Sequence, residues 1–167
     1  MKKPNTNNSH DLPTPQQDLV QELRQLISET RARVVATVNS AMVVLYWQIG
    51  KRINAEILQG ERADYGKQIV ATVSRQLTAE FGNGFGEKNL RHMLRFAEAF
   101  DEDQIVSATR RQLSWTHYRA LIYMDDPLRR QFYLEMCRAE RWSTRALQER
   151  IDSMLYERTA LSRKPEE

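Results

Sequence analysis

Basic and amide side chains gather over little more than two helical turns near the middle of the chain. Lys88, Arg91 and Arg95 follow i, i+3, i+7 spacing, which places them on one face of a helix, with Asn89 and His92 beside them. Arginine and lysine donate hydrogen bonds to phosphate oxygens and guanine edges, while asparagine pairs with adenine edges. These residue types at this spacing predict contacts to double-stranded DNA, made by all five side chains.

Two amphipathic helical patterns must position this group. They cover residues 64–80 and 86–100, and a turn with glycine at positions 82, 84 and 86 joins them. The pattern is typical of a helix-turn-helix, whose second helix presents one apolar side to its own domain and its donors to the major groove. The alternative is an ordinary helical hairpin with a solvated basic edge. The predicted buried stripe of the second helix is Leu90, Met93, Leu94, Ala97 and Phe100.

The charge distribution agrees with this placement. The chain of 167 residues has a net charge of +3, with 19 arginines and 6 lysines. Residues 62–95 by themselves account for a net +3, whereas residues 101–167 are balanced. The positive field therefore lies around the glycine turn, which is compatible with a nucleic-acid partner.

Other kinds of site have little support in the sequence. His117 has no matching nucleophile, so we expect it to bond a neighbouring helix, and Cys137 lies in a helical pattern as a packed thiol. Three histidines and one cysteine are scattered, without the spacing of a zinc site, and there is no glycine-rich phosphate loop. No cofactor and no metal are expected.

Apolar stretches are too short to cross a membrane, which takes about 18 residues. The longest, from Ser40 to Gly50, is about half that length, and the polar N-terminus does not look like a signal peptide. A single cysteine fits a reducing compartment. We expect no membrane partner and a cytoplasmic location.

Proline placement favours an all-α fold. None occurs between Gln16 and Asp126, and 41% of the residues are apolar, enough for a buried core. We expect a disordered tail at residues 1–15, a helical domain at 16–160 and a frayed end at 161–167.

A long helical pattern opens the predicted domain, from about Gln16 to Leu58. An unbroken helix of this length would span on the order of 65 Å, more than a small domain is wide. Either it breaks near Asn39–Ser40 or at Gly50, or it projects and packs against a second copy as a homodimer. Around Ala41 to Ile49 apolar residues surround the helix, which predicts burial on several sides.

Local signals place the remaining helices. Residues 101–112 form a connection with about one helical turn. Ser114 can cap a short helix to Met124, Pro127 can begin another that reaches Trp142, and Ser143 can cap a last helix over 144–158.

Several spaced motifs resemble the bacterial YhcG-like family, over roughly residues 16–160. The most specific is Phe81-Gly-Asn-Gly-Phe-Gly-Glu-Lys-Asn-Leu-Arg-His-Met93, and residues 31–51, 62–67, 113–118, 142–145 and 155–158 match in the same order. In that family this region is thought to be a helix-turn-helix or winged-helix DNA-binding module, with a small wing, ahead of a PD-(D/E)XK nuclease domain. The resemblance implies a role associated with DNA recombination or repair.

Three departures from the family pattern matter. Gly86 stands where the family tends to have serine, so a side-chain cap is missing, and Leu94 and Ala97 replace residues that are often arginine and an aromatic. No lysine is preceded two positions earlier by Asp or Glu, so the (D/E)xK signature does not occur in the chain. We therefore predict a DNA-binding module that is not an enzyme. The alternative is a protein-interaction module that partners a separately encoded nuclease or a restriction system.

Overall fold

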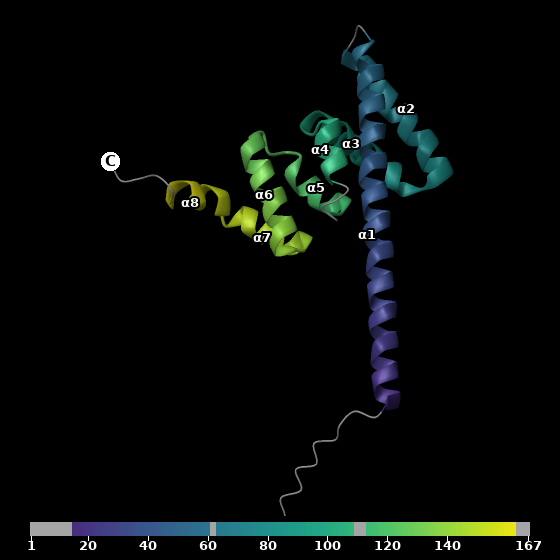
Figure 1. Ribbon diagram of the computed structural model, residues 1–167. Helices are drawn as coiled ribbons and strands as arrows, with labels where there is room; N and C mark the ends of the chain where they lie inside the picture. Colours follow the sequence, from purple (N-terminus) through teal and green to yellow (C-terminus); the bar gives the residue numbers. More distant parts are fainter. Residues whose placement is uncertain (1–14, 61–62, 109–112, 163–167) are drawn as a thin grey trace, which may run out of the picture. The chain divides into compact units, whose positions relative to one another are not determined.

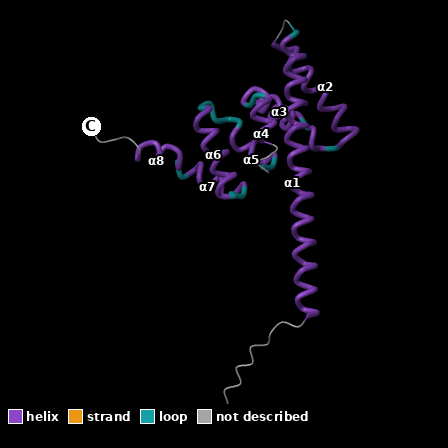
Figure 2. The backbone as a smooth tube through the Cα atoms, viewed as in Figure 1, coloured by secondary structure: helices purple, strands orange, loops and turns teal. Residues whose placement is uncertain are grey.

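The residues that the structure describes are mainly helical. A computed structural model describes residues 15–60, 63–108 and 113–162, and these contain no β-strand (Figure 1, Figure 2). The all-α class is confirmed, while the small wing has no counterpart in these ranges. In chain order the elements are α1 (Pro15–Leu58), α2 (Ala63–Phe81), the 3-10 turn η1 (Asn83–Phe85), α3 (Glu87–Ala99), α4 (Glu102–Ala108), α5 (Trp115–Leu121), α6 (Pro127–Glu140), α7 (Thr144–Asp152) and α8 (Leu155–Ser162).

Helix α1 runs without a break, so neither of the two predicted break points is found. The chain divides into two compact units, one ending at Val35 and the other beginning at Ala36, and α1 contributes to both. Of the predicted tail only Pro15 is described, as the first residue of α1, and residues 1–14 lie outside the described ranges. Of the predicted frayed end, α8 includes Leu161 and Ser162, and 163–167 lie outside.

Glycine at position 50 allows a close helix crossing rather than a break. A Cβ atom there would lie 1.9 Å from the carbonyl oxygen of Met93, so the backbones of α1 and α3 could not approach this closely with any other residue. One turn further along, Asn54 Nδ2 donates to the carbonyl oxygen of Leu94 at 3.0 Å. Helix α3 is therefore fixed against α1 by backbone contact.

Two hydrophobic clusters form the core of the second unit, and α3 contributes to both. The smaller cluster joins Ile53 of α1 and Val70 of α2 to Leu90 and Met93 of α3. The larger one contains buried side chains contributed by α1, α3 and the C-terminal helices: Val43, Trp47, Phe96, Phe100, Ile105, Leu113, Tyr118, Leu121, Ile122, Met124, Tyr133, Leu134, Cys137 and Leu147. Because α3 is held on both sides, its orientation is set by the whole unit.

Burial around Ala41 to Ile49 is more one-sided than predicted. Val43 and Trp47 are buried, but Leu45 is 41% exposed. This part of α1 therefore packs with one side, and apolar residues on its other side remain in contact with solvent.

Local caps begin the C-terminal helices as predicted, but two helices, α7 and α8, take the place of the single last helix that was predicted. Asp126 accepts from the backbone N–H of Leu128 at 2.9 Å, and Ser143 accepts from Ala146 at 3.1 Å. The predicted helix 144–158 is interrupted at Met154, whose φ of 55° lies in the left-handed region. The buried Tyr133 stabilises this break, since its hydroxyl accepts from the N–H of Tyr156 at 3.3 Å at the start of α8.

Candidate nucleic-acid interface

The connection from α2 to α3 is a five-residue turn with one obligatory glycine. Gly82 has a φ of 91°, which side chains rarely tolerate, and η1 follows it directly. Gly86 then caps α3 through its backbone only: its carbonyl accepts from the N–H of Leu90 at 3.0 Å, and there is no side-chain cap. The first N–H groups of α3 are therefore not covered by a capping side chain, as the sequence predicted.

Helix α3 places its apolar side inward and its predicted contact residues toward the surface. Leu90, Met93 and Phe96 are fully buried, and Phe100 follows at 3% exposure. Phe96 is missing from the predicted stripe, while Leu94 and Ala97 are only partly buried. Phe96 follows Met93 by three residues, and this spacing could have placed it on the buried stripe. Rings of α5 pack against Phe96 and bury this side of α3.

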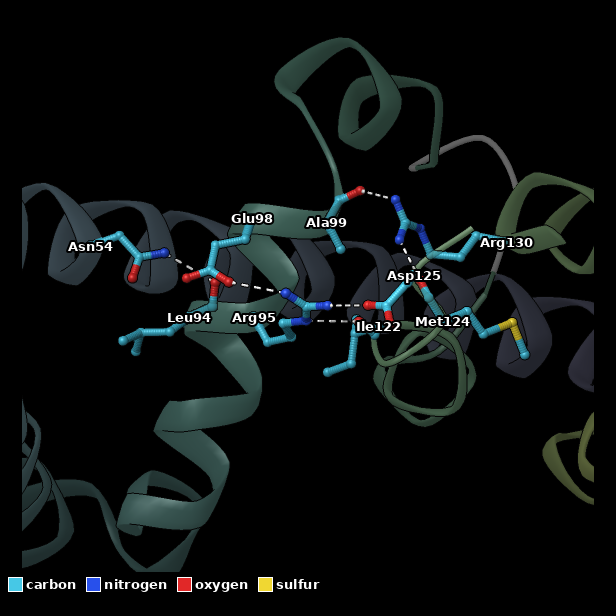
Figure 3. A network of polar contacts seen from close by, with 9 residues as sticks. All are labelled: Asn54, Leu94, Arg95, Glu98, Ala99, Ile122, Met124, Asp125 and Arg130. Atoms are coloured by element: carbon cyan, nitrogen blue, oxygen red, sulfur yellow. Dashed lines mark hydrogen bonds and ion pairs between the residues drawn. The ribbon is translucent and has the colours of Figure 1, made fainter. Parts of the chain in front are cut away.

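The second half of α3 uses its predicted contact residue, Arg95, to hold the fold. The Arg95 guanidinium donates to Asp125 Oδ1 at 2.9 Å and to the carbonyl oxygen of Ile122 at 3.2 Å (Figure 3). Glu98 approaches it at 3.5 Å. Arg130 makes a parallel connection from α6, donating to the carbonyl oxygens of Met124 and Ala99. These bonds tie α3 to the loop between α5 and α6, so Arg95 is not available to a ligand without loss of that connection.

Asn89 is also used within the fold. Its amide nitrogen donates to the carbonyl oxygen of Gly84 in the turn, and its Oδ1 accepts from the indole N–H of Trp115 at 3.3 Å. Both ends of the amide therefore hold the turn and α5 in place. A base contact by Asn89, as predicted, would have to break one of these bonds.

Arg91 has one partner, on an exposed surface. It pairs with Glu87 one turn earlier at 3.1 Å, and both side chains are at least half exposed. An exposed pair of this spacing contributes only about 0.3–0.5 kcal/mol. Arg91 can therefore exchange its carboxylate partner for a phosphate at small cost.

His92 lies between Tyr123 and two cations. Its Nδ1 is 2.6 Å from the Tyr123 hydroxyl, and the two rings meet edge to face. Burial, and then the positive charges of Arg119 and Lys88, lower the pKa of His92 from its usual value. The imidazole is therefore mostly neutral at pH 7, and its Nε2 atom is buried without a hydrogen-bond partner among the described residues.

Lys88 and Arg119 line a pocket at the start of α3. The site predicted from the sequence included only some of its lining residues. The pocket has a volume of about 290 Å³. Among the described residues neither Lys88 nor Arg119 has a carboxylate within ion-pair distance, in contrast to Arg91 and Arg95. Arg119 was missed because it lies in α5, 31 residues from Lys88. The lining residues are Asn83, Gly86, Lys88, Asn89, His92, Trp115 and Arg119.

A larger hollow between α1 and α2 has different chemistry. It has a volume of about 590 Å³ and mostly aliphatic walls, including Ile49, Ile53 and Val73. Among its described lining residues the one cation, Arg52, is already paired with Glu56 at 2.9 Å. This hollow therefore offers an anion much less than the smaller pocket does.

His117 and Cys137 have packing roles in the structure. His117 Nδ1 accepts from the N–H of Ser114 at 3.2 Å, and its Nε2 then donates to the carbonyl oxygen of Trp142 at 2.9 Å. Cys137 is buried, and burial raises the pKa of its thiol to about 11, far above that of a reactive cysteine. Across the described ranges no group of three or more His, Cys, Asp or Glu side chains is arranged to hold a metal ion. No described helix combines the length and apolar character needed to cross a membrane.

Comparison with known proteins gives a family but no solved relative. Residues 22–158 match the DUF1016 N-terminal domain. The chain is similar to the Escherichia coli (strain K12) protein named "Putative nuclease YhcG", with 30% identity over 168 residues that cover 82% of this chain and 44% of that protein. The chain thus spans less than half the length of this curated relative, and no solved structure matches it. On the strength of this match, the chain belongs to the DUF1016 N-terminal domain family.

Proposed function

We propose that this chain is a DNA-binding module, in which α2, η1 and α3 act as a helix-turn-helix and the pocket at the start of α3 takes a backbone phosphate. The observation that carries the proposal is the convergence of Lys88 and Arg119 on that pocket, both of them without a carboxylate partner among the described residues. A phosphate there would meet two cations and the uncapped N–H groups of α3.

Two further features support this placement. Arg91 lies on the next turn of α3 and can add a contact by leaving Glu87. A relative whose name includes "nuclease" is consistent with a domain that meets nucleic acid.

The proposed contacts are mostly to phosphate, which fixes position more than sequence. Arg95 and Asn89, the side chains best suited to reading bases, are held by Asp125, Gly84 and Trp115. We therefore expect binding with little sequence preference and a strong dependence on salt.

The test is a salt titration with the full chain and a labelled duplex, followed by fluorescence anisotropy between about 50 and 200 mM salt. In the variant K88E/R119E we expect at least about a tenfold loss of affinity. The slope of log affinity against log salt should become shallower by roughly 1.8, because two phosphate contacts are lost.

The matched control is R138E/R145E, which changes net charge equally at two exposed arginines of α6 and α7 that pair with Glu135 and Glu149. This control should lose little affinity. No binding of the unaltered chain at low salt would overturn the proposal and favour the protein-interaction module. An equal loss in both variants would show that only net charge matters and would reject the pocket.

A further inference from the structure

The first unit of the chain presents an apolar stripe to solvent. Every described side chain from residue 17 to residue 35 is exposed. Seven large aliphatic side chains within this segment are between 44% and 58% exposed, and Val35 is the one that lies away from the others around the helix. The other six are Leu19, Val20, Leu23, Leu26, Ile27 and Val34. These residues, the aliphatic stripe, belong to the N-terminal part of α1, at the purple end of Figure 1.

Spacing gathers the stripe on one side of the helix. At about 100° per residue its six members fall within a sector of roughly 120°, with Thr30 near the middle. The opposite side holds Gln21 and Ser28. A helix with this division is stable in water when its apolar side is covered, and an isolated helix of this length is marginal.

Charged residues border the stripe with opposite sign on its two edges. Glu22 and Glu29 lie along one edge, while Arg24 and Arg31 lie along the other. Arg33, which donates to the hydroxyl of Thr30 at 3.2 Å, falls at the end of the acidic edge and is its one exception.

We propose that the aliphatic stripe pairs with the same stripe of a second copy of this chain, with the two helices parallel. In a parallel pair the acidic edge of one helix faces the basic edge of the other, so Glu22 lies beside Arg24 and Glu29 beside Arg31 of the other copy. In an antiparallel pair acidic edge meets acidic edge and basic meets basic. The charge pattern is therefore complementary to itself in the parallel orientation only.

The apolar positions fit the same arrangement. Leu19 and Leu26 occupy d positions of a heptad, Leu23 occupies an a position, and Val20, Ile27 and Val34 widen the seam at e. The polar Thr30 and Arg33 take the following a and d positions, so the apolar a/d seam covers the first part of the stripe. A parallel pair has its two-fold axis along the seam, which makes the contact closed and limits it to two copies. Such a dimer carries two copies of the DNA-binding unit and would raise the affinity for a long duplex through avidity.

The first experiment measures the mass of the full chain by sedimentation equilibrium over a wide concentration range. We expect a monomer–dimer equilibrium whose dissociation constant rises at least about tenfold in L23D/L26D. The control Q21D/S28D adds the same charge on the opposite side of the helix and should leave the dissociation constant within about twofold. A chain that remains monomeric at every concentration overturns the proposal. A dimer that L23D/L26D leaves intact also overturns it, since the contact must then lie elsewhere.

The second experiment tests orientation. Reversing one edge, in E22K/E29K or in R24E/R31E, should weaken the dimer, and combining the four changes in one chain should restore it. An antiparallel pair would respond differently, because like charges already face each other there and reversing one edge changes nothing. Leu19→Cys gives an independent readout: oxidation should cross-link a parallel dimer, since the two d positions face each other there, whereas in an antiparallel pair they lie at opposite ends of the stripe. Failure of this cross-link in a variant that still dimerises rejects the parallel orientation.

Discussion

The two halves of α3 carry similar basic side chains, but these side chains differ in whether the fold supplies their partners. In the second half Arg95 is held by Asp125 and by the carbonyl oxygen of Ile122, while Arg130 holds the carbonyl of Ala99 at the helix end (Figure 3). In the first half Lys88 has no acidic partner within the described ranges and shares a pocket with Arg119. One end of the helix is fixed to the fold, and the other is available to an anion.

This difference shows that helical spacing selects a face but does not show which of its charges are free. Lys88, Arg91 and Arg95 share a face by spacing, yet each has a different electrostatic environment. A cation serves a ligand at least cost when no carboxylate of the fold already pairs with it, and such a carboxylate can come from a distant part of the chain, as Asp125 does for Arg95.

Removing a buried side chain that supports both halves of α3 should have the largest effect. Phe96 is fully buried and contacts the rings of Phe100, Trp115 and Tyr118. Phe96→Ala should lower the free energy of unfolding by about 3–5 kcal/mol, measured by urea denaturation, and should abolish DNA binding where the protein unfolds. A loss below about 1 kcal/mol would show that the two halves do not depend on this core.

The second prediction tests whether Arg95, in the second half of α3, serves the fold and not the DNA. Arg95→Met keeps an apolar stem in place of the arginine methylenes but removes three polar contacts, so we expect a loss of about 1–2 kcal/mol in the free energy of unfolding. DNA affinity, measured on the folded protein, should change less than twofold beyond the effect of one charge. If Arg95→Met reduces affinity more than Lys88→Ala does, the assignment of the two halves is wrong.

The third prediction compares two exposed cations of the first half. Lys88→Ala should reduce DNA affinity several-fold and make the salt slope shallower by about 0.9. Arg91→Ala should have a smaller effect on both, because Arg91 must first leave Glu87, whose charge then repels the phosphate. Anisotropy titrations of the two variants, each losing one positive charge, supply the comparison. Equal slopes for both variants would contradict it.

The smallest effect should come from His92. Its pKa is lowered in the folded protein, so the unfolded chain binds a proton more readily, and stability should fall as the pH drops from about 7 through the pKa of the unfolded histidine near 6.5. The decline should end below the folded pKa, where both states are protonated. In His92→Gln this part of the pH dependence should disappear, as measured by urea unfolding midpoints at a series of pH values. An unchanged pH profile would show that His92 is not the group responsible.

Much of the fold was predictable because its signals are local. Caps at Asp126 and Ser143, and the turn at Gly82, depend on residues within one helical turn of themselves. The break at Met154 was not predictable from such signals, since it is stabilised by Tyr133 from another helix. Gly50 was equally ambiguous: a glycine inside a helical pattern suggests a break, and the backbone of Met93 explains its presence instead.

Residue types and their spacing along one element were enough to predict most of the helices, most of the apolar side of α3 and the basic and polar candidates on that helix. Only the tertiary structure decided which of those side chains are engaged. Asp125 and Trp115 lie 30 and 26 residues from the α3 side chains that they hold, and Arg119 joins Lys88 from a different helix. The electrostatic state of a side chain depends on neighbours in space, and spacing along the chain does not contain them.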